Sequence, residues 1–515
     1  MELYTNKDLA IFEENISNIE DRLIERENKL LEPTYEERKA IEKIILDYIR
    51  QYKRKVYGGY AQNTLISARN KDDAFYPEHH VADLDFYSPE PIEDLIRIAN
   101  LLFEKGYPYI QGIEAVHKET YSVFANFNNA CDISYVPKNI FHRMPYVEIN
   151  GVNYVHPSFI MIDLYRIFTD PLVSGSFRWK KTFPRLFLLQ KHYPFNKSTS
   201  KLPEIKLNSS TTKPILDTIF NFIKDKESII VYGTYAYNHY LNKSNVLKDE
   251  SLRRKYKFID VPFYEVLSTN YQEDSIKLIE LIKATHPEIS EQINIVEYYP
   301  FWSFLGYSVL IHYNEAPLIH IINYNRRCYP IRKVEANKYN NNAVQSEKGT
   351  IQIASYDLQL LMNLITTFRY RVLKDEEMYQ YYNIMTSHLI EMRKHFFETT
   401  NSNILDETLF QEFIIECIGE PLDPLREARI IRGLKAKQGK LIVFKYSPSD
   451  GIKEAKSNYK FSNSSGNAIR NPANFRIIKT APGIHKPRDR DRVEEADAEE
   501  EKVEEVPEDI IDRQS

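Results

Sequence analysis

Long apolar runs are absent from this sequence: no stretch of about 18 consecutive apolar residues occurs that would cross a membrane. The opening residues 1–15 are too acidic and too polar for a secretory signal. Cysteine is scarce, and Cys131, Cys328 and Cys417 lack paired or metal-type spacing. We therefore expect a soluble, intracellular protein whose three cysteines are buried thiols, without a disulfide framework or a zinc site.

Charge is unevenly distributed along the chain, although the net charge is only -5. Residues 489–515 contain 13 acidic and 4 basic side chains, which predicts a disordered acidic tail. Residues 432–488 contain 13 basic and 2 acidic side chains with aromatic residues between them. This basic segment, from 435 to 488, is a candidate RNA-contact surface.

A glycine pair follows the first predicted strand, Lys55–Tyr57. Two amphipathic helices are expected before it, over 7–31 and 34–52, and a third helix is expected from Tyr60. Strand, Gly58-Gly59 and helix form an arrangement that suits a phosphate, because glycine lets backbone N–H groups approach an anion. An ordinary turn is the alternative, and a glycine pair alone does not exclude it.

Three aspartates lie on predicted strands. In Val81–Tyr87, alternation places Asp83 and Asp85 on one face. A later hairpin, 121–136, turns at Asn128-Asn129 and carries Asp132 on its second strand. Neighbouring carboxylates repel each other unless cations neutralise them, so these residues are candidate metal ligands. A solvent-facing strand is the alternative for an isolated D-x-D.

The chain contains an internal repeat that bears on this choice. Tyr57-Gly58-Gly59-Tyr60-Ala61-Gln62-Asn63 recurs as Tyr232-Gly233-Thr234-Tyr235-Ala236-Tyr237-Asn238, and Asp83-Leu84-Asp85-Phe86-Tyr87 aligns with Asp260-Val261-Pro262-Phe263-Tyr264. In this alignment Pro262 replaces Asp85 and Leu318 replaces Asp132. Because one copy loses these acids and keeps the pattern, we interpret the acids of the first copy as catalytic.

The predicted fold class is α/β (α+β), with tandem domains of which the second is degenerate. The expected divisions are an N-terminal helical segment (1–52), a catalytic domain (53–195), a degenerate domain with its helices (214–400), C-terminal helices (401–434, with helix over 405–417), the basic segment (435–488) and the acidic tail (489–515).

The glycine turn, the D-x-D strand and the later single aspartate resemble the polymerase β-like nucleotidyltransferase superfamily. A catalytic copy followed by a degenerate copy, with helices in front, resembles the poly(A) polymerase catalytic subunits of large DNA viruses, over residues 1 to about 430. The resemblance implies that Gly58 and Gly59 lie at the ATP triphosphate. It also implies that Asp83, Asp85 and Asp132 hold two Mg²⁺ or Mn²⁺ ions.

Two residue patterns depart from the cellular relatives. Gly59 stands where they usually have serine, and the gap between Gly59 and Asp83 is longer, which implies an inserted loop around Asn70–His80. Arg178 and Lys181 are further candidate nucleotide contacts, with a solvated helix face as the alternative. A nucleotide-sugar glycosyltransferase also uses D-x-D, but it leaves the glycine turn and Asp132 unexplained.

The function implied by the resemblance is template-independent addition of AMP from ATP to RNA 3′ ends. Another RNA nucleotidyltransferase, or a non-catalytic RNA-binding scaffold derived from one, is the alternative. The family also implies a homodimer or a cap-methyltransferase subunit as a processivity partner. The expected location is the viral factory in the host cytoplasm, and the virion, with no membrane partner.

Overall fold

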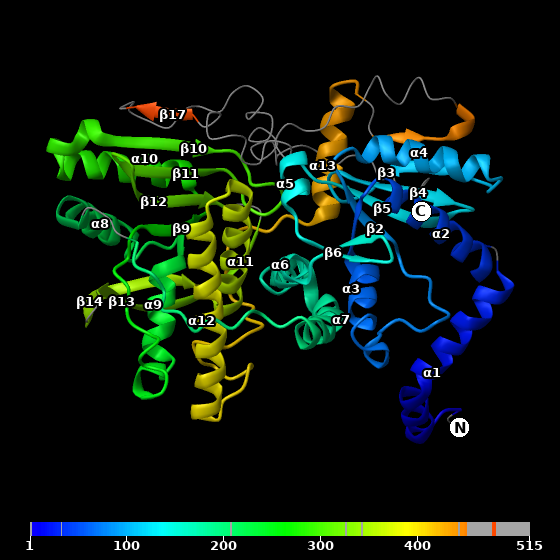
Figure 1. Cartoon of the computed structure of the whole chain (residues 1–515), viewed down its shortest axis with the longest axis horizontal. Coiled ribbons are helices and arrows are strands. Elements are labelled where there is room, and N and C mark those ends of the chain that lie inside the picture. The colour runs from blue at the N-terminus through cyan, green and yellow to red at the C-terminus, as the bar shows by residue number, and fades with distance from the viewer. Residues whose placement is uncertain are drawn as a thin grey trace. The chain divides into compact units, whose positions relative to one another are not determined.

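The chain folds into two compact units. The computed structural model describes residues 3–31, 33–205, 209–324, 327–340, 343–440, 443–450 and 476–479 (Figure 1). The first unit comprises residues 1–136, 145–157 and 441–460, and the second comprises 137–144, 158–440 and 461–515. The acidic tail and most of the basic segment predicted above lie outside the described residues.

The first unit is built on one mixed sheet. Its elements are α1 (Asn6–Leu30), α2 (Tyr35–Gln51), β1 (Lys55–Tyr57), α3 (Gly58–Ser67), η1 (Lys71–Asp73), β2 (Asp85–Ser88), α4 (Pro91–Glu104), β3 (Gln111–Glu114), β4 (Thr120–Ala125), β5 (Asn128–Tyr135), β6 (Tyr146–Ile149), β7 (Val152–Val155), β16 (Lys445–Tyr446) and η4 (Pro448–Asp450). The strand order is β16-β3-β4-β5-β2-β1-β7-β6.

Alternation along the central strands separates the two faces of this sheet. Val56, Phe86 and Ile133 are fully buried, and helices α2 and α4 pack on the sheet against β4, β5 and β7. The side chain of Thr34 accepts a hydrogen bond from the N–H of Glu37, which begins α2 where the sequence predicted. The apolar face of the sheet therefore provides the core of this unit.

The second unit is built on a nine-stranded sheet. Its elements are α5 (Lys138–Arg143), α6 (Pro157–Phe168), α7 (Pro171–His192), α8 (Ser209–Ile223), β8 (Ile229–Tyr232), α9 (Gly233–Lys243), η2 (Val246–Lys248), β9 (Tyr264–Ser268), α10 (Tyr271–Thr285), η3 (Pro287–Gln292), β10 (Ile293–Tyr298), β11 (Ser308–Tyr313), β12 (Ala316–Asn323), β13 (Tyr329–Asn340), β14 (Ala343–Ala354), α11 (Tyr356–Leu373), α12 (Glu376–Thr400), β15 (Cys417–Ile418), α13 (Pro424–Lys437) and β17 (Arg476–Lys479). The strand order is β15-β13-β14-β8-β9-β12-β11-β10-β17. Helices α9, α11 and α12 pack together (Figure 1).

The two sheets share one topology, which confirms the internal repeat. Read from the opposite end, β17-β10-β11-β12-β9-β8-β14-β13 matches β16-β3-β4-β5-β2-β1-β7-β6 strand for strand. Strand directions agree as well: β1 is antiparallel to β2 and parallel to β7, as β8 is to β9 and β14. In both units a helix begins at the glycine that directly follows the first strand.

A buried aspartate braces each sheet from the helix that follows its second strand. In the first unit Asp94 accepts hydrogen bonds from both Nε and Nη2 of Arg54, at 2.7 and 2.8 Å, and from the hydroxyl of Tyr48 at 2.7 Å. In the second unit Asp274 pairs with Lys226 at 2.7 Å. Each brace ties the segment before the first strand to that helix.

Two local expectations are wrong. Residues 405–417 are not helical, whereas the helices expected at the end of the degenerate domain are present as α11 and α12, separated where Lys374 adopts a left-handed backbone at φ 62°. Cys328 and Cys417 form a disulfide and only Cys131 remains a buried thiol, because the antiparallel pairing of β13 with β15 sets Pro330 opposite Cys417. None of the described helices is both long and apolar enough to span a bilayer.

The brace in the first unit yields a stability prediction. Asp94→Ala leaves the buried Arg54 guanidinium without its carboxylate, so we expect the first unit to lose about 3–5 kcal/mol of stability. Thermal unfolding of the full chain should show an earlier first transition. Glu93→Ala is the matched control, because Glu93 forms only an exposed pair with Arg97. Equal melting of the two variants would contradict the role of the brace.

Candidate active site

The glycine turn after β1 lies against a carboxylate. Gly58 has a φ of 71°, and a Cβ at this position would overlap the carboxylate of Asp85. Helix α3 begins at Gly58 without a side-chain cap at Tyr57, so its first N–H groups are not covered by a capping side chain. A helix N-terminus with exposed N–H groups attracts anions, and glycine permits the close approach that the turn requires here.

Strand pairing brings two of the three aspartates together. In the parallel pair β2–β5, Asp85 is the register partner of Asp132, and on its other side Asp85 faces Tyr57 of β1. Both carboxylates are half-buried. Asp83 is exposed and precedes β2, which begins at Asp85 and is shorter than the strand predicted over 81–87. The buried neighbours Leu84 and Phe86 confirm the predicted alternation.

Polar side chains surround Asp132 on its face of the sheet. Ser122 donates to Oδ1 of Asp132 at 2.6 Å, and the amide of Asn129 donates to the same oxygen at 3.0 Å. These bonds fix the carboxylate while its second oxygen takes part in neither. On the opposite face, burial raises the pKa of Cys131 well above its ordinary value, and the charges of Asp132 and Asp85 raise it further.

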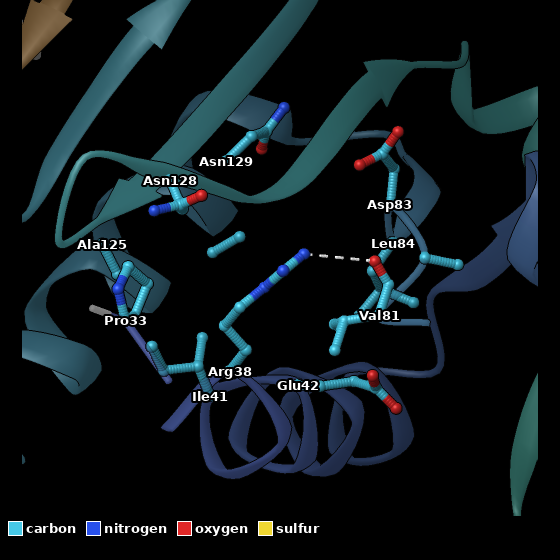
Figure 2. Close-up of a pocket in the computed structure, with 12 residues that line it drawn as sticks. Pro33, Arg38, Ile41, Glu42, Val81, Asp83, Leu84, Ala125, Asn128 and Asn129 are labelled. Atoms are coloured by element: carbon cyan, nitrogen blue, oxygen red, sulfur yellow. Dashed lines mark hydrogen bonds between the residues drawn. The ribbon is translucent and has the colours of Figure 1, made fainter. Parts of the chain in front are cut away.

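A cavity opens beside Asp83. Figure 2 shows Arg38 and Ile41 of α2 on one side and Asn128 and Asn129 of β5 on the other, with Asp83 at the rim. The guanidinium of Arg38 extends across it and donates to the carbonyl of Val81 at 3.3 Å. The cavity therefore connects the exposed aspartate with the amide that holds Asp132.

The donor set suits a hard divalent cation. Asp85 and Asp132 supply carboxylate oxygens from neighbouring strands, which Mg²⁺ and Mn²⁺ prefer, and Asp83 stands two residues before Asp85. As the side chains stand, no three Asp, Glu, His or Cys residues within the described ranges converge closely enough to hold an ion. Two strand carboxylates provide the start of such a site.

The second sheet corrects the alignment on which the repeat was interpreted. Tyr232 faces Glu265, not Pro262, and the register partner of Glu265 on β12 is His320, not Leu318. Glu265 therefore occupies the place of Asp85, and His320 that of Asp132. The alignment was out of register because it matched Phe86-Tyr87, three and four residues after Asp83, with Phe263-Tyr264, whereas the strands are related by Ser88 and Ser268.

A sequence signal for the correct register does exist. Ser88 precedes Asp94 by the same interval as Ser268 precedes Asp274, and each Asp follows a Glu. In both units the serine hydroxyl accepts from a backbone N–H two residues later, and the aspartate forms the brace described above. These residues belong to the fold of both copies, so they align the copies more reliably than the site residues do.

The site of the second copy is closed by protein groups. The N–H of Gly233, which would face a phosphate, donates instead to the buried side chain of Gln359 at 3.0 Å. Glu265 is 3% exposed, and burial raises its pKa to about 7. His320 is also buried and contacts Ser308 at 2.9 Å. The second copy is therefore degenerate for two reasons. Glu265 and His320 replace the two strand aspartates, and protein side chains fill the space of the site.

Arg178 and Lys181 lie on α7 in the second compact unit, and both are exposed. The three aspartates belong to the first unit, so the role of Arg178 and Lys181 stays a prediction. The neighbouring Trp179 donates to the carbonyl of Ile167 at 2.9 Å and packs on Phe413. That aromatic side chain serves the core of the unit and is not a stacking surface.

Two aromatic residues of the basic segment are buried and therefore are not candidates for RNA contact. Phe444 and Tyr446 are buried in the first unit, where β16 pairs with β3 and the Tyr446 hydroxyl donates to Asn100 at 2.5 Å. They extend the sheet, so a stacking role toward RNA does not apply to them. The remaining aromatic residues of this segment lie outside the described ranges.

Comparison with known proteins identifies the family of this chain. Residues 43–174 match the family of poly(A) polymerase catalytic subunits, and residues 188–479 match the C-terminal part of the APMV poly(A) polymerase catalytic subunit. The poly(A) polymerase catalytic subunit of Acanthamoeba polyphaga mimivirus is 35% identical over 490 residues, covering 91% of this chain and 83% of that protein.

Two further relatives differ in how much of the chain they cover. The corresponding subunit of African swine fever virus, isolate Pig/Kenya, is 31% identical over 156 residues, covering 29% of this chain and 32% of that protein. The crystal structure of the Megavirus polyadenylate synthase superimposes with a TM-score of 0.82 at 33% identity, covering 92% of this chain and 94% of that one. This chain belongs to the poly(A) polymerase catalytic subunits of large DNA viruses and is a nucleotidyltransferase with tandem domains.

Proposed function

We propose that this poly(A) polymerase carries out AMP transfer at the central strands of the first sheet, with Asp83, Asp85 and Asp132 as ligands of two Mg²⁺ or Mn²⁺ ions. The observation that carries the proposal is the register of β2 and β5, which sets Asp85 beside Asp132 and next to the Gly58 turn. Two carboxylates side by side favour a bound cation, because their negative charges repel each other unless a cation neutralises them.

The chain's own groups position the two substrates. Backbone N–H groups of Gly58 and Gly59, at the start of α3, would bind the ATP triphosphate. Ser122 and Asn129 hold Asp132 in one orientation. When bound, divalent cations neutralise phosphate charge and lower the pKa of the RNA 3′ hydroxyl. Asp132 is also placed to accept the proton of that hydroxyl as it attacks the α-phosphate and pyrophosphate leaves.

Removal of single carboxylate charges tests the assignment. Asp85→Asn and Asp132→Asn should each lower primer extension with ATP by about 100-fold or more, since each removes a charge that the cations require. Glu265→Gln is the matched control at the place of Asp85 in the closed second copy, and its activity should stay near that of the wild type. Extension that survives in both aspartate variants would refute the site.

Gly58 tests the turn separately. Gly58→Ala places a Cβ into the Asp85 carboxylate and should lower kcat for extension by about tenfold or more. Gly106→Ala is the matched control, because Gly106 also has a positive φ, 87°, but nothing lies within 4 Å of its Cβ position. Both variants bear a similar backbone strain of about 1–2 kcal/mol. Equal kcat in the Gly58→Ala and Gly106→Ala variants would show that the turn takes no part in the reaction.

The processivity partner and the location in the cell stay proposals. Helix α1 has no buried residue and exposes Leu9, Phe12 and Leu23, an apolar surface that a second copy or a cap-methyltransferase subunit would cover. We expect a homodimer, which light scattering of the purified chain should show at twice the 60.8 kDa of the monomer. A monomer that makes only short products alone would favour a separate subunit.

The location in the cell and two phosphate contacts are also proposed. The proposed location is the viral factory and the virion. Arg178 and Lys181 are proposed to contact phosphate groups.

A further inference from the structure

Asp83 differs from the other two aspartates in what holds it. Asp85 and Asp132 are fixed in a ladder between neighbouring strands, whereas Asp83 precedes β2 in a segment without regular structure. The hydrogen bonds between β2 and β5 extend toward the N-terminus as far as Leu84, whose carbonyl accepts from the N–H of Asp132 at 3.0 Å. The position of Asp83 therefore depends on contacts made to residues 74–82.

The N-terminal helices provide such contacts. Arg38 of α2 donates from Nη2 to the carbonyl of Val81 at 3.3 Å and from Nη1 to Oδ1 of Asn28 at 3.2 Å. The amide of Asn28, on α1, donates in turn to the carbonyl of His79 at 2.8 Å. Arg38 and Asn28 are half-buried, and together they bind the backbone two and four residues before Asp83.

Two more side chains bind the same inserted segment. The hydroxyl of Tyr35 donates to the carbonyl of Glu78 at 2.8 Å. At the other end of the insert, Oδ1 of Asn63 on α3 accepts from the N–H groups of Phe75 and Tyr76, at 2.8 and 3.1 Å. The insert is thus held from α3 at its start and from α1 and α2 at its end.

The second copy shows which part of this arrangement belongs to the repeat. Asn238 stands where Asn63 stands, and its side chain both donates to the carbonyl of Ile259, at 2.7 Å, and accepts from its N–H, at 3.0 Å. A helix asparagine therefore holds the approach to the second strand in both copies. The first copy, whose carboxylates remain open to the solvent, also has the contacts made by Asn28, Tyr35 and Arg38.

We propose that Arg38 is a positioning residue for Asp83, supported by Asn28 and Tyr35, and that the N-terminal helices thereby belong to the catalytic apparatus. The proposal rests on the proposed role of Asp83 as a metal ligand. The guanidinium fixes the backbone at Val81 and lines the cavity that Asp83 borders (Figure 2). Residues that orient metal ligands from the second layer typically change metal affinity by about 10–100-fold when removed.

Binding of Mn²⁺ to the full chain with a non-hydrolysable ATP analogue tests the proposal without turnover. Arg38→Ala should weaken Mn²⁺ binding by about tenfold, measured from the EPR signal of unbound Mn²⁺. Tyr35→Phe removes one hydroxyl and should weaken it by about threefold. Lys43→Ala, on the exposed side of the same helix, is the charge-matched control and should bind as the wild type does. Wild-type affinity in both Arg38→Ala and Tyr35→Phe would overturn the proposal.

A double substitution shows whether Arg38 acts through Asp83. In an Asp83→Ala background, Arg38→Ala should cause no further loss of Mn²⁺ affinity. A second tenfold loss would mean that Arg38 binds the nucleotide or the site directly, and this would overturn a positioning role. If Arg38→Ala lowers the melting temperature markedly, Tyr35→Phe is compared in the wild-type and Asp83→Ala backgrounds instead. This variant keeps the aromatic ring and loses only the hydroxyl, so its Mn²⁺ affinity decides whether these contacts act through Asp83.

Failure of the proposed function gives a different result. If Asp85→Asn binds Mn²⁺ as tightly as the wild type, the carboxylates are not the ligands, and the proposed site falls. If Asp85→Asn loses affinity while Arg38→Ala and Tyr35→Phe keep it, the site stands and only the positioning role is wrong.

Discussion

The register between β1, β2 and β5 is the constraint on which the site depends. It sets Asp85 between Tyr57 and Asp132, so two carboxylates lie side by side and the glycine turn closes over one of them. Like charges this close are unfavourable in a half-buried setting, and a cation relieves their repulsion. A shift of either strand by one residue would turn its carboxylate to the apolar face, so the apolar core that fixes the register also fixes the proposed pair of ligands.

The duplication separates what the fold requires from what the reaction requires. Both copies keep the strand order, the glycine turn and the buried aspartate brace, Asp94 in one and Asp274 in the other. Only the second copy buries its remaining carboxylate, Glu265, and gives the N–H of its turn to Gln359. The loss of a site therefore takes two changes: new residues on the strands, and side chains that fill the space a phosphate would occupy.

Local pattern predicted the glycine turn and the helices around it, because these rest on residues close in sequence, and a recurring short motif predicted the repeat. The roles of the three aspartates stay a prediction. Long-range pairing was harder to predict. The copies were aligned three residues out of register at Asp85, and Cys328 and Cys417 lie 89 residues apart, so their disulfide leaves no local signal. Phe444 and Tyr446 fall within the basic segment predicted as a candidate RNA-contact surface, because composition cannot show that β16 pairs with β3.

The longer gap between the glycine turn and the D-x-D motif acquires a physical meaning in the structure. A short connection would leave the first aspartate little freedom, whereas an insert adds conformations that folding must restrict at a cost of about 1–2 kcal/mol per residue. Asn63 restricts one end of the insert, as Asn238 does in the other copy, and Arg38 restricts the end that carries Asp83. The proposed metal ligand outside the sheet thus follows a segment that helices preceding the domain in sequence bind, and the boundary expected at residue 52 cuts through these contacts.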